Sequence, residues 1–105
     1  MYFRFLPFSR FRTTLEVPQA GWWTFILSSD DGSWLAIGDR LYIDHGGQHG
    51  IYPPAASRIN MNAGFYDLTL YYVQFQFAHG IVLEWEGAIL FFKLLYRSLR
   101  RVGYF

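Results

Sequence analysis

The stretch that decides the fold is GWWTFILSSDDGSWLAIG, residues 21–38. Its first part, residues 22–29, is rich in aromatic and β-branched side chains, which favour strands. Trp23, Phe25 and Leu27 alternate with their neighbours, so they fall on one face of the predicted strand. Trp22, Thr24 and Ile26 fall on the other face, so the alternation predicts a strand.

A turn follows this strand at residues 30–32, Asp-Asp-Gly, because Asp-Gly is a preferred turn dipeptide. The chain then resumes as a strand, so a β-hairpin is the plainest interpretation of the segment. Similar alternating strands, separated by turn signals, are predicted at residues 9–18, 33–37, 40–44, 57–61, 65–73 and 81–86. Short strands with regular turns are typical of an all-β protein, either an antiparallel β-sandwich or a barrel.

Composition narrows the class of protein. The chain has 105 residues, enough for a single domain, and is 52% hydrophobic and 22% aromatic with only 16% charged residues. So many rings are hard to hide in one small core, and we expect exposed aromatic surface that meets a ligand or a partner. The net charge of +1 gives no general attraction for nucleic acid. The absence of cysteine excludes disulfides, thiolate chemistry and cysteine zinc sites.

The two ends of the chain are aromatic and basic. Residues 1–11 are apolar, but arginine and proline interrupt them, so they are not typical of a signal peptide. The longest apolar run, residues 88–92, is far too short to cross a bilayer. The tail at residues 88–105 fits either a strand or a short basic amphipathic helix, and both interpretations stay open.

An ordered series of segments carries a family pattern. They are GWWTF (21–25), SDDGSWLAIG (29–38), ID (43–44), GGQHG (46–50), NAGFY (62–66), LYY (70–72) and LEWEG (83–87). In this order they resemble PA14 domains, the β-sandwich module of toxin protective antigens, glycosidases and yeast flocculin-type adhesins. The pattern is strongest over 21–87, and residues 88–105 are a divergent aromatic and basic tail. The resemblance implies one PA14-like antiparallel β-sandwich over 1–105, extracellular or on a cell surface.

The resemblance also implies binding rather than catalysis. In lectin-like members, two adjacent acids joined by a cis peptide hold a calcium ion, which a sugar ligates through vicinal hydroxyls. The acids here are Asp30 and Asp31, and Gln74 stands where the second loop of such members supplies an amide side chain, often Asn. Backbone carbonyls of the residues that follow, here 75–78, complete the implied set. Calcium prefers six to eight such oxygen ligands, with carboxylates supplying charge.

Each of these residues also has a plainer interpretation. The acidic pair can be an ordinary Asp-Gly hairpin turn, and Gln74 can be a solvated loop amide. Trp34, beside the acidic turn and out of phase with Leu35, can stack on a sugar ring or pack within the protein. The residues alone do not decide between these alternatives.

The loop from Asp44 to Gly50 offers Asp44, His45 and His49 as zinc ligands. Two glycines between the histidines argue against the helix that an i, i+4 pair needs, and the family pattern carries a Gly-x-His-Gly step here without metal chemistry. We therefore expect His49 to be structural and hydrogen-bonded to the backbone. The sequence contains no nucleophile elbow, P-loop or dinucleotide fingerprint, so it does not predict an enzyme.

The aromatic ends support a second hypothesis of a different class. Phe3, Phe5, Phe91, Phe92 and Phe105 exceed what short terminal segments need. They predict a structural subunit that self-associates into an oligomer or filament through these rings and binds no sugar. Intramolecular packing of both ends is the alternative, and contact of the basic tail with a membrane surface is the least favoured.

Overall fold

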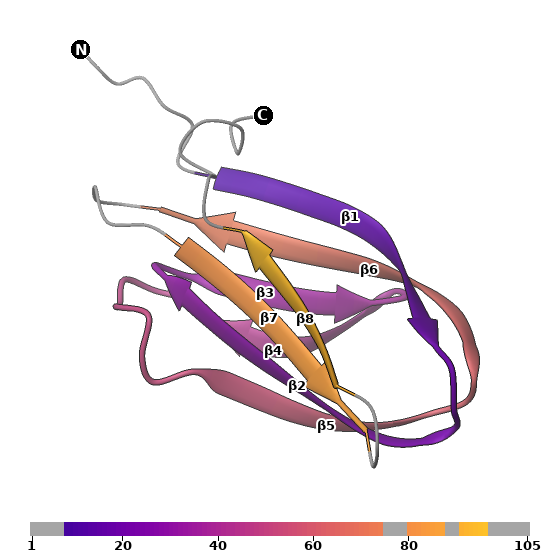
Figure 1. Cartoon of the computed structure of the whole chain (residues 1–105). Helices are drawn as coiled ribbons and strands as arrows, with labels where there is room; N and C mark the ends of the chain where they lie inside the picture. The colour runs from indigo at the N-terminus through magenta and orange to yellow at the C-terminus, as the bar shows by residue number, and fades with distance from the viewer. Residues whose placement is uncertain (1–7, 75–79, 88–90, 97–105) are drawn as a thin grey trace.

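The computed structural model describes residues 8–74, 80–87 and 91–96, the last of these by their backbone. Its described elements are all strands: β1 (Phe8–Val17), β2 (Gly21–Asp30), β3 (Ser33–Ile37), β4 (Arg40–His45), β5 (Ala55–Met61), β6 (Gly64–Val73), β7 (Gly80–Glu86) and β8 (Phe91–Tyr96). They form two four-stranded antiparallel sheets, in the orders β1-β6-β3-β4 and β5-β2-β7-β8 (Figure 1). The predicted all-β antiparallel sandwich is confirmed.

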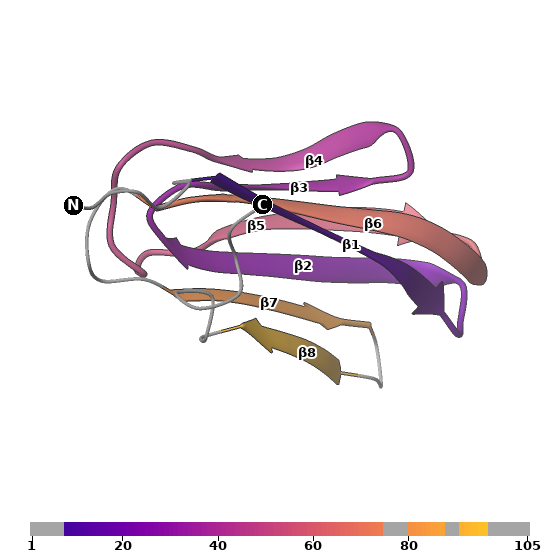
Figure 2. The same ribbon diagram turned by 90° about the horizontal axis from the view of Figure 1, so that it is seen from above.

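The inner faces of the two sheets meet in an apolar core. In β2 the predicted stripe of Trp23, Phe25 and Leu27 is buried, whereas Trp22 points outward. The other buried apolar residues are Leu15, Val17, Leu35, Ile37, Ile43, Ile59, Met61, Leu68, Leu70, Tyr72, Ile81 and Leu83. Burial of apolar surface contributes about 25 cal/mol per Å², so this core is the main source of stability. Seen from above, β4 and β8 lie at opposite sides of the molecule (Figure 2).

The segment at residues 30–32 is not a hairpin turn, so that interpretation was wrong. β2 pairs with β5 and β7, whereas β3 pairs with β4 and β6, so the chain crosses from one sheet to the other between Asp30 and Ser33. An Asp-Gly dipeptide favours a reversal of the chain, but it does not determine whether the strands before and after it pair with each other. The true hairpin is β3–β4, where Gly38 takes the left-handed φ of 65° that glycine tolerates.

The tail continues the second sheet. Phe91–Tyr96 forms β8, which pairs with β7, so the strand alternative holds for these six residues and the helix alternative is wrong there. The rest of the tail lies outside the described residues. No helix long and apolar enough to cross a membrane occurs among the described residues.

Aromatic side chains are exposed, as the composition predicted. Tyr52 and Phe65 are 76% and 72% exposed, and Phe8 and Trp22 are about half exposed. The Arg58 guanidinium lies 4.5 Å from the centre of the Trp22 ring, which leaves part of that ring in contact with a cation. Surface rings are therefore spread over both sheets and the loop after β4.

Candidate functional site

The acidic turn is held to the end of β6 by backbone hydrogen bonds. The Asp31 N–H donates to the Val73 carbonyl at 3.2 Å, and the Val73 N–H donates to the Gly32 carbonyl at 2.8 Å. Because Gln74 directly follows Val73, this pairing brings the chain at Gln74 to the turn that carries the two acids. The ends of β2 and β6 accordingly lie at the same end of the sandwich (Figure 1).

Buried hydroxyl groups hold the backbone on both sides of the turn. The Tyr72 hydroxyl, itself buried, donates to the Asp30 carbonyl and accepts from the Gly80 N–H at 2.9 Å. The Ser29 hydroxyl bonds the Asp31 carbonyl at 2.6 Å and also meets the Ser33 hydroxyl. An unpaired buried polar group is costly, so these bonds specify one backbone path through the turn.

The Asp31 side chain faces the loop that follows β4. Asp31 is only 3% exposed, and one of its carboxylate oxygens accepts a hydrogen bond from the His49 backbone N–H at 3.1 Å. The two segments also approach closely at Gly32, where an added Cβ would stand 3.0 Å from the backbone nitrogen and oxygen of Gly47. The loop is therefore packed directly against the acidic turn.

The His49 ring is fixed by the backbone, as predicted. Its Nδ1 lies 2.8 Å from the Gly50 carbonyl oxygen, and its Nε2 lies 2.8 Å from the His45 carbonyl oxygen. Only the imidazolium has two N–H donors for two such acceptors. The pKa of His49 is raised above 6.5, first by the His45 carbonyl, against desolvation, and further by the Gly50 carbonyl and the charges of Asp31 and Asp30.

His45 lies against His49, and its pKa is shifted in the opposite direction. The two ring centres are 4.0 Å apart. Burial, and then the charge of His49, lower the pKa of His45 below 6.5, while the Pro53 carbonyl and Asp44 oppose this. Its Nε2 is buried without a hydrogen-bond partner among the described residues. One neutral and one charged imidazole is thus the arrangement that the surroundings favour.

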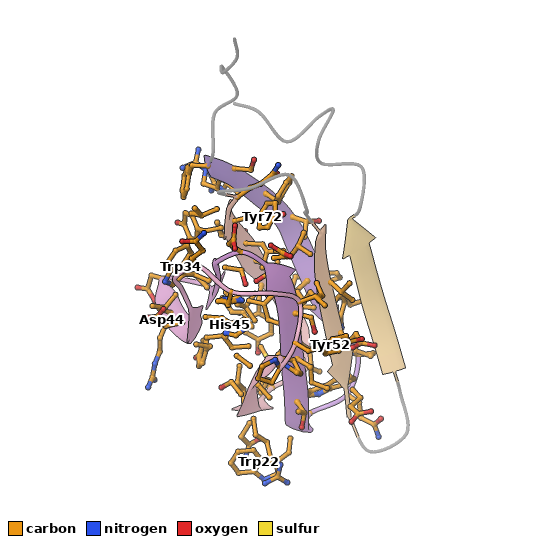
Figure 3. All side chains as sticks on the ribbon, turned by 90° about the vertical axis from the view of Figure 1, so that its left-hand side faces the viewer. Trp22, Trp34, Asp44, His45, Tyr52 and Tyr72 are labelled. Carbon is orange, nitrogen blue, oxygen red and sulfur yellow. The ribbon has the colours of Figure 1, made fainter. Side chains whose placement is uncertain are left out.

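Two peptide bonds in this region are cis, Asp30–Asp31 and Tyr52–Pro53. The first is the conformation that the PA14 resemblance implied for the acidic pair. Figure 3 looks onto this end of the sandwich, where Tyr72 and His45 lie over the strand ends and Trp34 and Asp44 lie together at one side.

The comparisons with known proteins agree with the fold. The family model of the PA14 domain matches residues 8–89. The chain belongs to the PA14 domain family. None of the curated proteins matches it. A solved structure of an anti-sigma factor domain-containing protein resembles this PA14 domain with a TM-score of 0.73 and 25% sequence identity. The likeness covers 82% of this chain and 30% of that chain, so this chain spans less than a third of that protein.

Membership gives the general class of function. PA14 domains are binding modules in many proteins and are typically non-catalytic, and they commonly occur in extracellular or surface proteins. Family membership alone therefore does not assign calcium, a sugar or a surface location to this PA14 domain.

The predicted site residues do not all stand in the same surroundings. Asp30 and Gln74 are half-buried and Asp31 is buried, and all three belong to the segments joined at Val73. Trp34 is also half-buried, and an added Cβ on Gly46 would stand 2.5 Å from its Cζ2, so its ring packs against the loop after β4. Residues 75–78, whose carbonyls the resemblance implied as ligands, lie outside the described residues.

The metal interpretations can be compared by donor chemistry. Asp30 and Asp31 offer carboxylate oxygens and Gln74 an amide oxygen, and oxygen is the ligand atom that calcium prefers. Nowhere in the described part of the chain do three or more His, Cys, Asp or Glu side chains form a group that could hold a metal ion. The oxygen donors are thus of the kind that calcium prefers, whereas the His49 ring is committed to backbone carbonyls.

Sequence reasoning missed the groups that support the acids. Tyr72 lies in the predicted strand at residues 65–73 without any predicted role, yet its hydroxyl joins Asp30, which lies 42 positions away, to Gly80. The His49 backbone N–H is a further such group. A buried tyrosine in an otherwise aliphatic stripe is a weak signal that its hydroxyl has a partner.

The hypothesis of self-association concerns aromatic residues that lie mostly outside the described part of the chain. Phe3, Phe5 and Phe105 lie outside the described residues, and Phe91 and Phe92 are described only as members of β8. Assembly through these rings stays a prediction.

Proposed function

We propose that this PA14 domain is a non-catalytic, extracellular binding module whose ligand is a carbohydrate held through calcium at Asp30, Asp31 and Gln74. Trp34, packed against the neighbouring loop, borders this site. The proposal extends the general binding role of the family to named residues and to a class of ligand.

The burial of the Asp31 carboxylate beside a second acid carries the proposal. A carboxylate that is 3% exposed is costly to desolvate unless partners compensate, and one oxygen of this carboxylate accepts the His49 backbone N–H at 3.1 Å. Asp30 adds a second negative charge close enough for both charges to raise the pKa of His49. Two acids gathered at one turn favour a divalent cation.

The neighbouring segments supply the other features that such a site needs. The pairing of Val73 with Asp31 and Gly32 brings Gln74 to the turn, where its amide oxygen adds a neutral ligand. Calcium bound there would present open coordination positions to the vicinal hydroxyls of a sugar. The loop from residue 46 to 54, with exposed Tyr52, forms the adjoining surface.

Isothermal titration of calcium into the protein tests the metal half of the proposal. We expect saturable binding by the natural chain and at least roughly tenfold weaker binding by Asp31→Asn, because the substitution removes a charge and keeps an oxygen for the His49 N–H. Gln74→Ala should weaken binding less, since it removes a neutral ligand. Asp67→Asn, at an exposed acid of β6, is the matched control and should bind like the natural chain.

A glycan array probed with and without calcium tests the second half. We expect binding to some glycans in calcium and its loss in EDTA and in Asp31→Asn. Equal calcium affinity for Asp31→Asn and the natural chain would contradict the metal site. Calcium binding without any calcium-dependent glycan would contradict the carbohydrate ligand alone.

A further inference from the structure

A second concave site lies at the other end of the sandwich. It is a pocket of about 290 Å³ formed between β4 and β5, the edge strands of the two sheets, which pack against each other on one side of the molecule. Met61, which lines the pocket, pairs with Gly21 at the start of β2. Asp30, in the acidic turn, lies at the other end of the same strand. Nine residue steps of about 3.4 Å place the pocket roughly 30 Å from the acidic turn.

The base of this pocket rests on the hydrophobic core and is firmly held, while the surface that the pocket exposes is more polar than apolar. Ile37, Ile59 and Met61 line it and are members of the hydrophobic core. Tyr42 and Tyr66, both half-buried, add aromatic surface to the wall. Well-packed core residues cannot easily move to fill the space, so the hollow is a lasting feature of the fold.

The rim carries polar groups that both donate and accept hydrogen bonds. Asn60 and Asn62 offer amide donors and acceptors, and Asp39 and Arg40 offer one acceptor and one donor group of opposite charge. The Arg40 guanidinium lies 5.3 Å from the centre of the Tyr42 ring, and the Tyr66 hydroxyl donates to the Asn62 carbonyl at 2.7 Å. The two charges balance, so the pocket has no preference for an ion of either sign.

We infer that this pocket is a second ligand site, independent of calcium, for a neutral polyhydroxylated ring of the size of a monosaccharide. Such a ring has an apolar face for tyrosine and the aliphatic floor, and hydroxyls that pair with amide, carboxylate and guanidinium groups. A volume of about 290 Å³ lies at the small end of ligand pockets, which excludes larger ligands from full enclosure. Asp30, Asp31 and Gln74 take no part, so the site goes beyond the proposed function.

A site at each end has a functional consequence. A module that holds one sugar at the acidic turn and another at this pocket can bridge two glycan chains or two points of one chain. Two linked binding events raise the overall avidity without any new contact. In Figure 3, Trp22, whose partner across the sheet is Asn60 of the pocket rim, stands well apart from Tyr72 and His45 at the acidic end.

Nuclear magnetic resonance on the ¹⁵N-labelled natural chain in EDTA tests the inference. D-glucose, D-mannose and D-galactose are titrated separately, and amide shifts are followed. We expect at least one of them to shift amides of residues 37–42 and 59–62 and to leave those of residues 29–33 unmoved. The double variant Arg40→Ala and Asn60→Ala should bind that sugar at least roughly tenfold more weakly.

Controls separate this site from the acidic turn and from misfolding. Arg12→Ala, at an exposed arginine of β1 outside the pocket, should behave like the natural chain, and the spectra themselves report whether each variant is folded. Asp31→Asn should also keep this binding. The inference is overturned if none of the three sugars shifts the pocket amides, if the double variant binds as the natural chain does, or if the pocket shifts require calcium.

Discussion

The backbone N–H of His49 donates a hydrogen bond to the carboxylate of Asp31 at 3.1 Å, across 18 positions of sequence. This contact joins the crossing between the two sheets to the long loop after β4. A charged acceptor makes such a bond stronger than a neutral pair. The conformation of the loop is therefore coupled to that of the acidic turn.

Asp31→Ala should destabilise the protein by about 1–3 kcal/mol even in EDTA, because the His49 N–H loses a buried acceptor. Urea unfolding followed by tryptophan fluorescence measures the free energy of unfolding. Asp67→Ala, at an exposed acid, is the control and should change it by less than about 0.5 kcal/mol. A stability of Asp31→Ala equal to that of the natural chain would show that the contact is energetically unimportant.

Substitutions of two tyrosines test whether the buried Tyr72 hydroxyl stabilises the acidic turn. Tyr72→Phe removes the hydroxyl shared by the Asp30 carbonyl and the Gly80 N–H and should cost about 1–3 kcal/mol. Tyr66→Phe removes a hydroxyl whose bond to the Asn62 carbonyl is exposed, so it should cost less than about 1 kcal/mol. Thermal or urea unfolding of both variants measures the difference. Equal losses for the two would contradict a special role for Tyr72.

The sandwich was predictable from local pattern because the strands alternate clearly. Trp23, Phe25 and Leu27 share one face, as their alternation predicts, and the structure shows that this is the buried one. The path between the sheets was not predictable, since Asp-Gly reports a change of direction and the pairing of β3 with β6 depends on contacts far along the chain. The PA14 resemblance implied Asp30, Asp31 and Gln74 as ligands, which stays a prediction, and no local signal revealed the groups that hydrogen-bond to the acidic turn.

Because the loop after β4 is closely packed, its glycines differ in how well they tolerate a side chain. A Cβ on Gly46 would stand 2.5 Å from the Trp34 ring, so Gly46→Ala must displace the indole or the loop, at a cost of about 1–3 kcal/mol. Gly50→Ala meets nothing within 4 Å and is the matched control. Unfolding experiments give the stabilities, and a shifted tryptophan emission in Gly46→Ala alone reports the displaced ring. An unchanged stability for Gly46→Ala would mean that the loop yields freely.

The two histidines of the loop should titrate on opposite sides of pH 6.5. The pKa of His49 is raised, chiefly by the His45 carbonyl, and that of His45 is lowered, chiefly by burial and then by the charge of His49. Removing that charge in His49→Gln should therefore raise the pKa of His45 toward 6.5. Ring-proton shifts followed across the pH range give both values, and a His45 that titrates at or above His49 would contradict the arrangement.

The same shifts set the sign of the pH dependence of folding. The unfolded chain titrates near 6.5, so the stabilisation from charged His49 is fully present below that pH and is lost as the pH rises through its raised pKa. The contribution of neutral His45 is present above 6.5 and is lost as the pH falls through its lowered pKa. Urea unfolding at a series of pH values separates the two: His49→Gln should abolish the loss of stability on the alkaline side of 6.5. It should reduce the loss on the acid side without abolishing it, because burial still lowers the pKa of His45.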